Sequence, residues 1–419
     1  MTDKTVKTTP SEKKDNKFDL RQIFEGSYNT LLPLLAIFTG LVIGAIVIAG
    51  TDATVIEAWK NFFQAPGAAF AAAWTSIATA YGALFGGSLG NPKEILAGIQ
   101  AYFSTGDSAA LLKSIYPISE SLVTATPYIF AGLAVAVGFR CGLFNIGAEG
   151  QFFMGALGSV FVGYSLKGLP AIIHLPLALL GGIAAGALWG AIPGYLKAKF
   201  GAHEVVNTIM MNWIGFRLSD WLLNGPMKAP GYRPVTSAVS EAAELPRFFP
   251  DPLRLNWGFI LALLVAWLIY WLLFKTTIGF EIRTVGANPD AAKYAGVNIV
   301  RNFVLAMVIS GGLAGLSGAS QVLGVDHWVG QGFSAGYGFD AIAIALLGKS
   351  HPLGVVLAAL LFGVLRGGAT RMQSMAGIPV DIISIIQGLV IIFVAAPGII
   401  RWLYRIHPAK NKQALQSRG

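Results

Sequence analysis

Long apolar runs, separated by short polar segments, dominate the chain from residue 31 onwards. A helix needs about 20 apolar residues to cross a bilayer. These runs are too long and too continuous for barrel strands, so they predict membrane-spanning helices. The expected fold is all-α, a polytopic helical membrane protein with about ten transmembrane helices. The predicted spans are 31–50, 118–139, 150–166, 173–196, 204–223, 257–274, 303–323, 337–348, 353–369 and 380–399.

The polar segments divide the chain into a membrane domain and two tails. The first apolar run is longer than the core of a secretory signal and lacks its small-residue cleavage site, so we expect it to be retained as a span. The predicted parts are an N-terminal tail over 1–30, a transmembrane domain over 31–399 with an extracytoplasmic or interfacial insertion over 51–114 and a cytoplasmic loop over 275–302, and a C-terminal tail over 400–419.

The basic residues predict the orientation. With ten spans the two termini share a side, and that side receives more than half of the 30 Lys and Arg residues. Cytoplasmic segments carry such an excess, so both termini are expected in the cytoplasm. The uncharged segment 65–87 is long enough to span, but an eleventh span would place one basic terminus outside. We therefore interpret this segment as an outer-face or interfacial helix.

Composition agrees with a membrane protein and excludes several functions. The chain is 54% hydrophobic and 12% charged, whereas a soluble domain is roughly a quarter charged. The net charge of +9 comes mainly from residues that flank the apolar runs, so it indicates membrane orientation and not nucleic-acid binding. The single cysteine, Cys141, excludes a disulfide framework, and five scattered histidines predict no metal site. We expect no catalytic residue in this chain.

A polar, glycine-rich segment links the second and third predicted spans and contains Asn145, Glu149 and Gln151. Two interpretations stay open. Asn145 caps the following helix, with Glu149 and Gln151 in its first turns. Alternatively, the three side chains line a substrate pathway, because ionisable groups at membrane depth usually face a cavity.

The fifth predicted span also begins with polar residues. Asn207, Thr208, Met211 and Asn212 fall at helical spacing, so several of them can face one cavity. Interhelical hydrogen bonding explains the same pattern at least as well. Glu204, at the start of this span, favours the helix dipole.

The short span 337–348 carries Asp340. In transporters, short or interrupted spans often lie at the substrate path, because irregular backbone is tolerated only against protein or water. Asp340 is therefore a further pathway candidate. Arg366 and Arg371, in and after the next span, are interface residues or members of structural pairs.

The loop from Lys275 to Arg301 contains the start and stop signals of a short helix. Asn288 is suited to cap it, Pro289 to its first position and Asp290 to its first turn, and Gly296 ends the turn that follows Ala291 and Ala292. An exposed helix held between two spans is a docking element. A solvated loop is the alternative.

The sequence Leu347-Gly348-Lys349-Ser350 resembles the end of a phosphate-binding loop. However, the glycine required five positions before Gly348 is Ala343, and no strand precedes it. We therefore expect no nucleotide site here. If ATP drives transport, another chain hydrolyses it.

Four segments in order resemble a known family. Gly142–Gln151, Glu204–Asn212, Arg283–Gly296 and Gly338–Gly354 are similar to permeases of the branched-chain amino acid and ribose type of ABC importer. The resemblance covers about Leu122 to Pro397 and is nearest to the nucleoside-uptake subgroup that works with a basic-membrane-protein type lipoprotein. The insertion 51–114 is longer than the link expected after the first span.

The resemblance implies a complex in the bacterial cytoplasmic membrane. Its parts are two permease subunits, expected to be a heterodimer, cytosolic ABC ATPase subunits that bind ATP and Mg, and an extracytoplasmic substrate-binding lipoprotein. This chain itself would bind no cofactor. Arg283 and the helix from Asn288 to Gly296 would transmit the motion of the ATPase to the spans.

The implied function is nucleoside import by alternating access. Simple sugars or branched-chain amino acids are alternative cargoes, and a proton- or sodium-coupled secondary transporter is an alternative mechanism. A membrane-embedded enzyme would need acids, histidines or metal ligands clustered at one depth. The sequence offers no such cluster.

Overall fold

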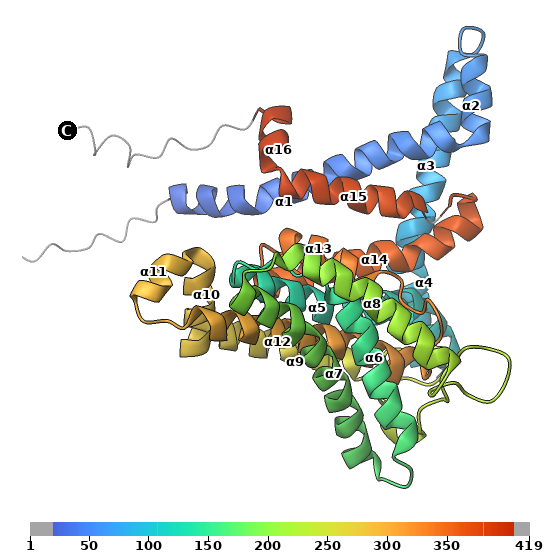
Figure 1. Ribbon diagram of the computed structural model, residues 1–419. Coiled ribbons are helices and arrows are strands. Elements are labelled where there is room, and N and C mark those ends of the chain that lie inside the picture. The colour runs from blue at the N-terminus through green and yellow to red at the C-terminus, as the bar shows by residue number, and fades with distance from the viewer. Residues whose placement is uncertain (1–19, 107, 380, 406–419) are drawn as a thin grey trace, which may run out of the picture.

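The computed structural model describes residues 20–106, 108–379 and 381–405, and most of these are helical (Figure 1). No strand occurs among them, which confirms the all-α prediction. The helices are α1 (Leu20–Thr51), α2 (Ala53–Lys60), α3 (Pro66–Ser88), α4 (Pro92–Thr105), α5 (Ser108–Arg140), α6 (Ala148–Ser165), α7 (Ala171–Phe200), α8 (Glu204–Asn224), a 3-10 turn η1 (Glu241–Ala243), α9 (Gly258–Lys275), α10 (Thr277–Ala287), α11 (Pro289–Tyr294), α12 (Ile299–Gln321), a π-helical turn η2 (Val322–Asp326), α13 (Tyr337–Leu347), α14 (Pro352–Ala376), α15 (Asp381–Ala395) and α16 (Pro397–Leu403).

Seven helical stretches of the described chain are long and apolar enough to cross a membrane, and the bent pair of α15 and α16 would make an eighth. The predicted count of ten is therefore not confirmed. α6 and α8, which occupy the predicted spans 150–166 and 204–223, are not among the seven, and α13 has only 11 residues. The seven stretches are Leu34–Thr51, Pro66–Thr105, Ser108–Arg140, Ala171–Phe200, Gly258–Lys275, Ile299–Asp326 and Pro352–Ala376.

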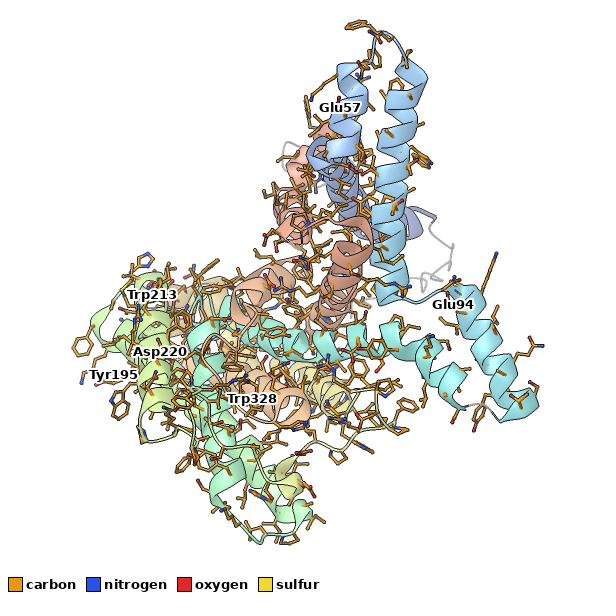
Figure 2. The ribbon with its side chains drawn as sticks, turned by 90° about the vertical axis from the view of Figure 1, so that its right-hand side faces the viewer. Glu57, Glu94, Tyr195, Trp213, Asp220 and Trp328 are labelled. Carbon is orange, nitrogen blue, oxygen red and sulfur yellow. The ribbon has the colours of Figure 1, made fainter. Side chains whose placement is uncertain are left out.

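The segment predicted to lie at the outer face forms α3. Together with α4 it has the length and hydropathy of a span, which charge parity had argued against. α3 runs up the view in both Figure 1 and Figure 2, whereas α1 and α15 run across Figure 1. α3 packs along α14. The axis of α3 is therefore at a large angle to that of α1.

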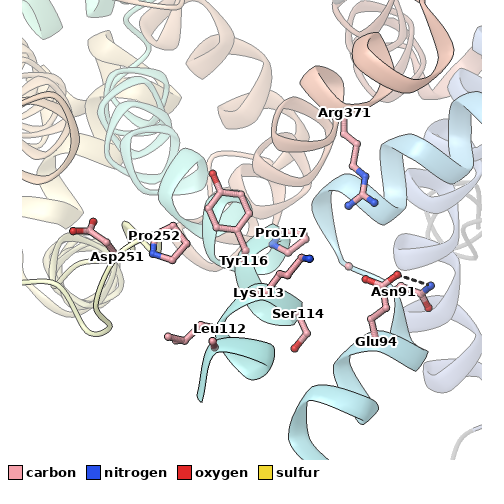
Figure 3. A pocket seen from close by; sticks show the side chains of 12 residues that line it. Asn91, Glu94, Leu112, Lys113, Ser114, Tyr116, Pro117, Asp251, Pro252 and Arg371 are labelled. Carbon is pink, nitrogen blue, oxygen red and sulfur yellow. Dashed lines mark hydrogen bonds between the residues drawn. The ribbon is translucent and has the colours of Figure 1, made fainter. Parts of the chain in front are cut away.

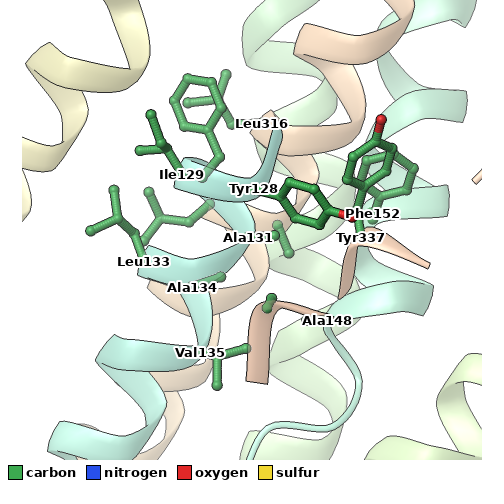
Figure 4. Close-up of a cluster of buried hydrophobic side chains, with 14 of the residues drawn as sticks. Tyr128, Ile129, Ala131, Leu133, Ala134, Val135, Ala148, Phe152, Leu316 and Tyr337 are labelled. Carbon is green, nitrogen blue, oxygen red and sulfur yellow. The ribbon is translucent and has the colours of Figure 1, made fainter. Parts of the chain in front are cut away.

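α5 forms the centre of the main hydrophobic core. Every residue from Pro127 to Gly138 is buried, and the helix packs against α12, α13 and α14. Figure 4 shows Tyr128 and Ile129 of α5 beside Phe152 of α6, Leu316 of α12 and Tyr337 of α13. A helix that is apolar on all sides belongs in the interior of a bundle.

Glycines bring α6, α7 and α12 into direct backbone contact. Gly155 on α6 and Gly186 on α7 both lie against Gly315 on α12, and none of the three positions has room for a Cβ atom. Small residues at such spacing let membrane helices approach closely. These three glycines therefore allow the close packing of α6, α7 and α12.

The ends of the molecule carry different elements. α10 and α11 lie on the left of Figure 1, on the side where α1 begins, and α3 and α4 lie on the right. The loop between α8 and α9 is ordered by backbone bonds to the segment after α12, where the Thr236 N–H donates to the Val329 carbonyl at 2.9 Å and the Leu245 N–H to the Leu323 carbonyl at 2.8 Å.

Candidate functional site

The turn between α5 and α6 holds a buried polar network. Asn145 Nδ2 donates to Gln151 Oε1 at 2.9 Å and to Ser310 Oγ on α12 at 2.8 Å. Asn145 Oδ1 accepts the Gly147 N–H at 2.9 Å. The N-cap of α6 is Gly147, so the prediction that Asn145 caps this helix is wrong; Asn145 lies two residues earlier and bonds to the cap residue. Asn145 and Gln151 thus join α6 to α12.

Asn212 attaches α8 to the same turn. Its Nδ2 donates to the Ile146 carbonyl at 2.9 Å, and its Oδ1 accepts the Gly150 N–H at 2.8 Å. Thr208 is fully buried and its hydroxyl donates within α8 to the Glu204 carbonyl at 2.8 Å. For Asn212 the structure therefore contains the interhelical hydrogen bonding that the sequence left open.

The two other α8 candidates differ from each other. Met211 is buried, and its carbonyl accepts the Trp189 indole N–H at 3.3 Å. Asn207 Nδ2 is buried without a hydrogen-bond partner among the described residues. Glu204, predicted to favour the helix dipole, pairs with Lys197 Nζ at 2.8 Å. Among the predicted pathway residues of α8, Asn207 is therefore the one with a buried amide donor that makes no hydrogen bond to the described residues.

Glu149 holds the start of α13. Its Oε1 accepts the Ser334 hydroxyl at 2.5 Å and its Oε2 accepts the Gly338 N–H at 2.6 Å. Only 3% of Glu149 is exposed. Gly338 lies so close to the Glu149 backbone that a Cβ would not fit. The carboxylate is therefore the contact between α6 and the segment that enters α13.

Asp340 lies two residues further along α13 than Gly338. Its Oδ2 accepts the hydroxyl of Tyr128, which is fully buried on α5, at 2.7 Å. The charge of Asp340 interacts with those of Glu149 and Arg366. Glu149 and Asp340, two of the predicted pathway candidates, are thus brought together at one end of one short helix.

Aromatic rings surround this pair of acids. The Tyr128 ring lies 4.8 Å from that of Tyr337, and the Tyr337 ring lies 5.5 Å from that of Phe152. Phe333 stacks on Phe152 at 5.4 Å and meets Phe153 edge-on at 4.9 Å. Rings from α5, α6 and the entry to α13 therefore form one layer beside the acids.

A cavity of about 550 Å³ opens on the α3 side of this layer. Tyr337 lines this cavity, together with polar residues of α5 and α14. Arg254 Nε donates to Glu120 Oε1 at 3.2 Å across its rim. Arg366 Nη2 donates to the Ala335 carbonyl at 3.2 Å. The cavity leads from the surface to the ring layer.

A second cavity of about 500 Å³ adjoins the first, and both are lined by Tyr116, Pro117 and Arg371 (Figure 3). From the sequence, Arg366 and Arg371 were predicted as interface residues or members of structural pairs, and Glu120 and Arg254 were missed. A signal for Glu120 existed, since it is an ionisable residue inside the predicted span 118–139. Its partner lies 134 residues away.

The predicted short helix in the loop after α9 is confirmed. Asn288 caps α11 and accepts the Ala291 N–H at 3.0 Å, and Pro289 occupies the first helical turn. Asp290 is exposed and Ala292 is fully buried. Gly296 adopts a φ of 82°, which suits glycine after the helix end. Its role in coupling stays a prediction.

The same loop contains a second helix, α10, that sequence reasoning missed. Gly286 on α10 lies directly against the Arg140 carbonyl at the end of α5, with no room for a Cβ. Arg283 Nε donates to the Leu273 carbonyl at 2.9 Å, and its guanidinium lies 5.1 Å from the Phe274 ring centre. Arg283 therefore supports the junction of α9 and α10.

The segment that resembles a phosphate-binding loop is a turn between two helices. It connects α13 to α14, and Lys349 and Ser350 have φ values of 52° and 50°. The Ser350 carbonyl accepts Arg140 Nε at 2.8 Å. A helix, α13, precedes this segment, whereas a strand precedes a phosphate-binding loop.

Apolar helices around buried acids, with a cavity open to one side, form the arrangement of a membrane transport protein. Residues 117–395 match the family described as "Branched-chain amino acid transport system / permease component". The match covers more than half of the chain, so the chain belongs to this permease family. The resemblance deduced from the four segments is confirmed.

Several relatives are similar over most of the chain. The guanosine ABC transporter permease protein NupP of Bacillus subtilis is 38% identical over 378 residues, 89% of this chain and 95% of NupP. The glucose ABC transporter permease protein TsgB13 of Haloferax volcanii is 37% identical, covering 67% of this chain and 77% of TsgB13. The nucleoside ABC transporter permease protein NupB of Lactococcus lactis is 35% identical, covering 74% of this chain and 87% of NupB.

A second permease protein from each of the two bacteria is also similar. NupQ of Bacillus subtilis is 30% identical, covering 61% of this chain and 82% of NupQ. NupC of Lactococcus lactis is 29% identical, covering 62% of this chain and 84% of NupC. No solved structure matches the chain.

Proposed function

We propose that this chain is the transmembrane permease subunit of an ATP-driven importer that carries nucleosides. The observation that supports this most strongly is the similarity to NupP, which extends over 89% of the chain. It therefore includes the helices that hold Glu149 and Asp340 as well as α10 and α11. ATP and Mg would be bound by a separate ATPase subunit, and this chain would bind no cofactor.

The proposed orientation places α10, α11 and both termini in the cytoplasm of a bacterium. The excess of Lys and Arg on that side supports it, and so does the start of α1 on the side of α10 and α11. The structure has seven candidate spans, or eight with the bent pair of α15 and α16. About ten crossings result if α6, α8 and α13 also enter the membrane and the α3–α4 stretch does not. Their polar residues are acceptable there because most of α6 and α13 is covered by other helices. α3 would then lie at the outer face.

The proposed pathway runs from the outer cavity past Tyr337 to the acids on α6 and α13. A nucleoside combines an apolar base face with hydroxyl and amide edges. The ring layer around Tyr337 suits the base, and the carboxylates of Glu149 and Asp340 can accept hydrogen bonds from the hydroxyls. Both carboxylates now bond within the protein, so substrate would exchange these contacts for its own.

Alternating access would use the same contacts. Glu149 joins α13 to α6, and Asp340 joins α13 to α5. Breaking the two contacts would let the start of α13 move away from the core and open the ring layer. Motion would arrive from α10, which contacts the end of α5 through Gly286.

The proposed complex contains a second, different permease subunit. Bacillus subtilis and Lactococcus lactis each have two similar permease proteins, and this chain is more similar to one of each pair, at 38% against 30% and 35% against 29%. A cytosolic ABC ATPase would contact α11, where Asp290 and Tyr294 are exposed. An extracytoplasmic binding lipoprotein would deliver substrate to the two outer cavities.

The test is uptake of a labelled panel in cells with and without this chain. The panel contains guanosine, other nucleosides, glucose and a branched-chain amino acid. Loss of nucleoside uptake alone, restored by a plasmid copy, is the expected result. Loss of glucose uptake would instead favour a sugar permease, the alternative that the 37% identity to TsgB13 supports. Uptake that survives ATP depletion but stops on collapse of the ion gradient would indicate a secondary transporter.

A further inference from the structure

An apolar groove of about 430 Å³ lies between α9 and the beginning of α14. Its α9 side consists of residues at three- and four-residue spacing, which place them on one face of the helix. Both walls are open to the surroundings, since 59% of Trp267 and 65% of Leu353 are exposed. The groove is lined by Leu263, Ala266, Trp267, Tyr270, His351, Pro352, Leu353 and Val356.

A cluster of positive charge stands at one end of this groove. His351 lines the groove, and its ring lies 5.3 Å from the ring of Phe274. The guanidinium of Arg140 lies 5.4 Å from the centre of the Phe274 ring, and that of Arg283 lies 5.1 Å from it. The end of α5 and the middle of α10 therefore bring two arginines to one aromatic ring at the end of α9, beside the groove.

This positive charge is not balanced by acids of the described chain. Arg140 and Arg283 each donate to a backbone carbonyl, and neither forms an ion pair with a carboxylate in the residues that the structure describes. Burial and the nearby Arg140 lower the pKa of His351. The charge of the cluster thus comes from the arginines and favours an anion.

The groove lies at the membrane depth of a phospholipid acyl chain, and the arginine cluster lies at the depth of its phosphate. α9 is an 18-residue apolar stretch that ends at Lys275, so Phe274 and the arginines lie where the span leaves the hydrocarbon. Tyr270 and Trp267 lie one and two turns deeper. An acyl chain fits an exposed apolar groove at that depth, and a phosphate fits two guanidinium groups at the interface.

We propose that this groove binds one anionic phospholipid, with an acyl chain against Trp267 and Leu353 and its phosphate at Arg140 and Arg283. A zwitterionic lipid is disfavoured because its ammonium group would approach the same arginines. An acidic segment of a partner protein would satisfy the charge, but it would not fill an apolar groove that faces lipid. The bound lipid would connect the end of α5 with α10 and the turn before α14.

The test measures quenching of Trp267 fluorescence by brominated lipids in vesicles that contain the full-length protein. Vesicles carry brominated phosphatidylglycerol or brominated phosphatidylcholine at equal mole fraction. The Trp267 signal is the difference between the wild-type protein and the Trp267→Phe variant. Trp213→Phe is the matched control, because Trp213 is 57% exposed on α8, far along the chain from the groove.

Two basic residues predict a preference of about 30-fold for phosphatidylglycerol at Trp267, and no preference at Trp213. Arg140→Lys should retain this preference, and the double variant Arg140→Gln with Arg283→Gln should lose it. Equal quenching of Trp267 by the two lipids in the wild-type protein would overturn the proposal, whatever the variants do. A preference that persists in the double variant, or that is equally strong at Trp213, would also overturn it.

Discussion

Tyr128 on α5 donates a hydrogen bond of 2.7 Å to the carboxylate of Asp340 on α13, although 212 residues separate them. Tyr128 is fully buried, and its ring packs 4.8 Å from Tyr337, the first residue of α13. Tyr337 lines the outer cavity. The contact therefore joins the central core helix to the short helix below the cavity, at the point where the proposed pathway must open.

Removing this hydrogen bond should slow transport. Tyr128→Phe keeps the ring packing and deletes the donor. A net hydrogen bond to a charged group is worth about 1.5–3 kcal/mol, so we expect nucleoside uptake to fall by roughly tenfold or more at equal protein level in the membrane. Initial uptake rates in the deletion strain measure this. Tyr102→Phe on α4, which is 45% exposed, is the control; similar losses in both variants would contradict the assignment.

The ion pair between Glu120 and Arg254 should affect transport with little effect on stability. The side chain of Arg254 is 44% exposed and that of Glu120 is 14% exposed, and a pair at the surface contributes about 1 kcal/mol to folding. Arg254→Glu places two acids at the cavity rim and should reduce uptake several-fold. The exchange variant, Glu120→Arg with Arg254→Glu, should recover part of the rate. Failure of the exchange to recover any uptake would show that the residues act separately.

Asp290 should serve the partner ATPase and not the fold of α11. It is exposed, whereas Ala292 in the same helix is fully buried, so a large residue at Ala292 would disturb packing as well as coupling. Asp290→Lys should leave assembly intact and abolish most ATP-dependent uptake while ATP hydrolysis continues. Glu57→Lys, an exposed charge reversal on α2, is the matched control. Normal uptake in Asp290→Lys would contradict a docking role.

The glycine contacts of α12 should control stability. Gly315→Ala introduces a Cβ against Gly182 and Gly186 of α7, and overpacking of this kind costs about 1–3 kcal/mol. Cys141 is the only cysteine and is fully buried, so a thiol-reactive dye reports unfolding. We expect a lower midpoint temperature for Gly315→Ala and an unchanged one for Gly82→Ala, which has open space around it.

The sequence predicted those features that depend on local signals. The cap at Asn288, the proline after it and the end at Gly296 lie within nine residues, and the short helix formed as expected. The order of the four segments also identified the family correctly. Turn signals and apolar periodicity depend on residues that are close in sequence, so they can be recognised without knowledge of tertiary contacts.

Features that depend on distant partners were not predicted. Asn145 bonds to Ser310 and Asn212 bonds to the backbone of α6, so both act in helix packing, which periodicity cannot distinguish from facing a cavity. The pair of Glu120 and Arg254 joins segments 134 residues apart. The predicted count of ten spans was not confirmed either, because α6 and α13 are mostly covered by other helices and need less apolar surface than helices that face lipid.

The central claim is that this chain forms the pathway of an ATP-driven nucleoside importer. The most direct measurement is uptake of labelled guanosine by vesicles that contain this chain with its second permease, ATPase and binding lipoprotein. The account predicts uptake that requires ATP on the ATPase side, persists with ionophores and falls strongly in Tyr128→Phe and Asp290→Lys. Guanosine uptake that needs an ion gradient and no ATP, or ATP-driven uptake of glucose in its place, would contradict it.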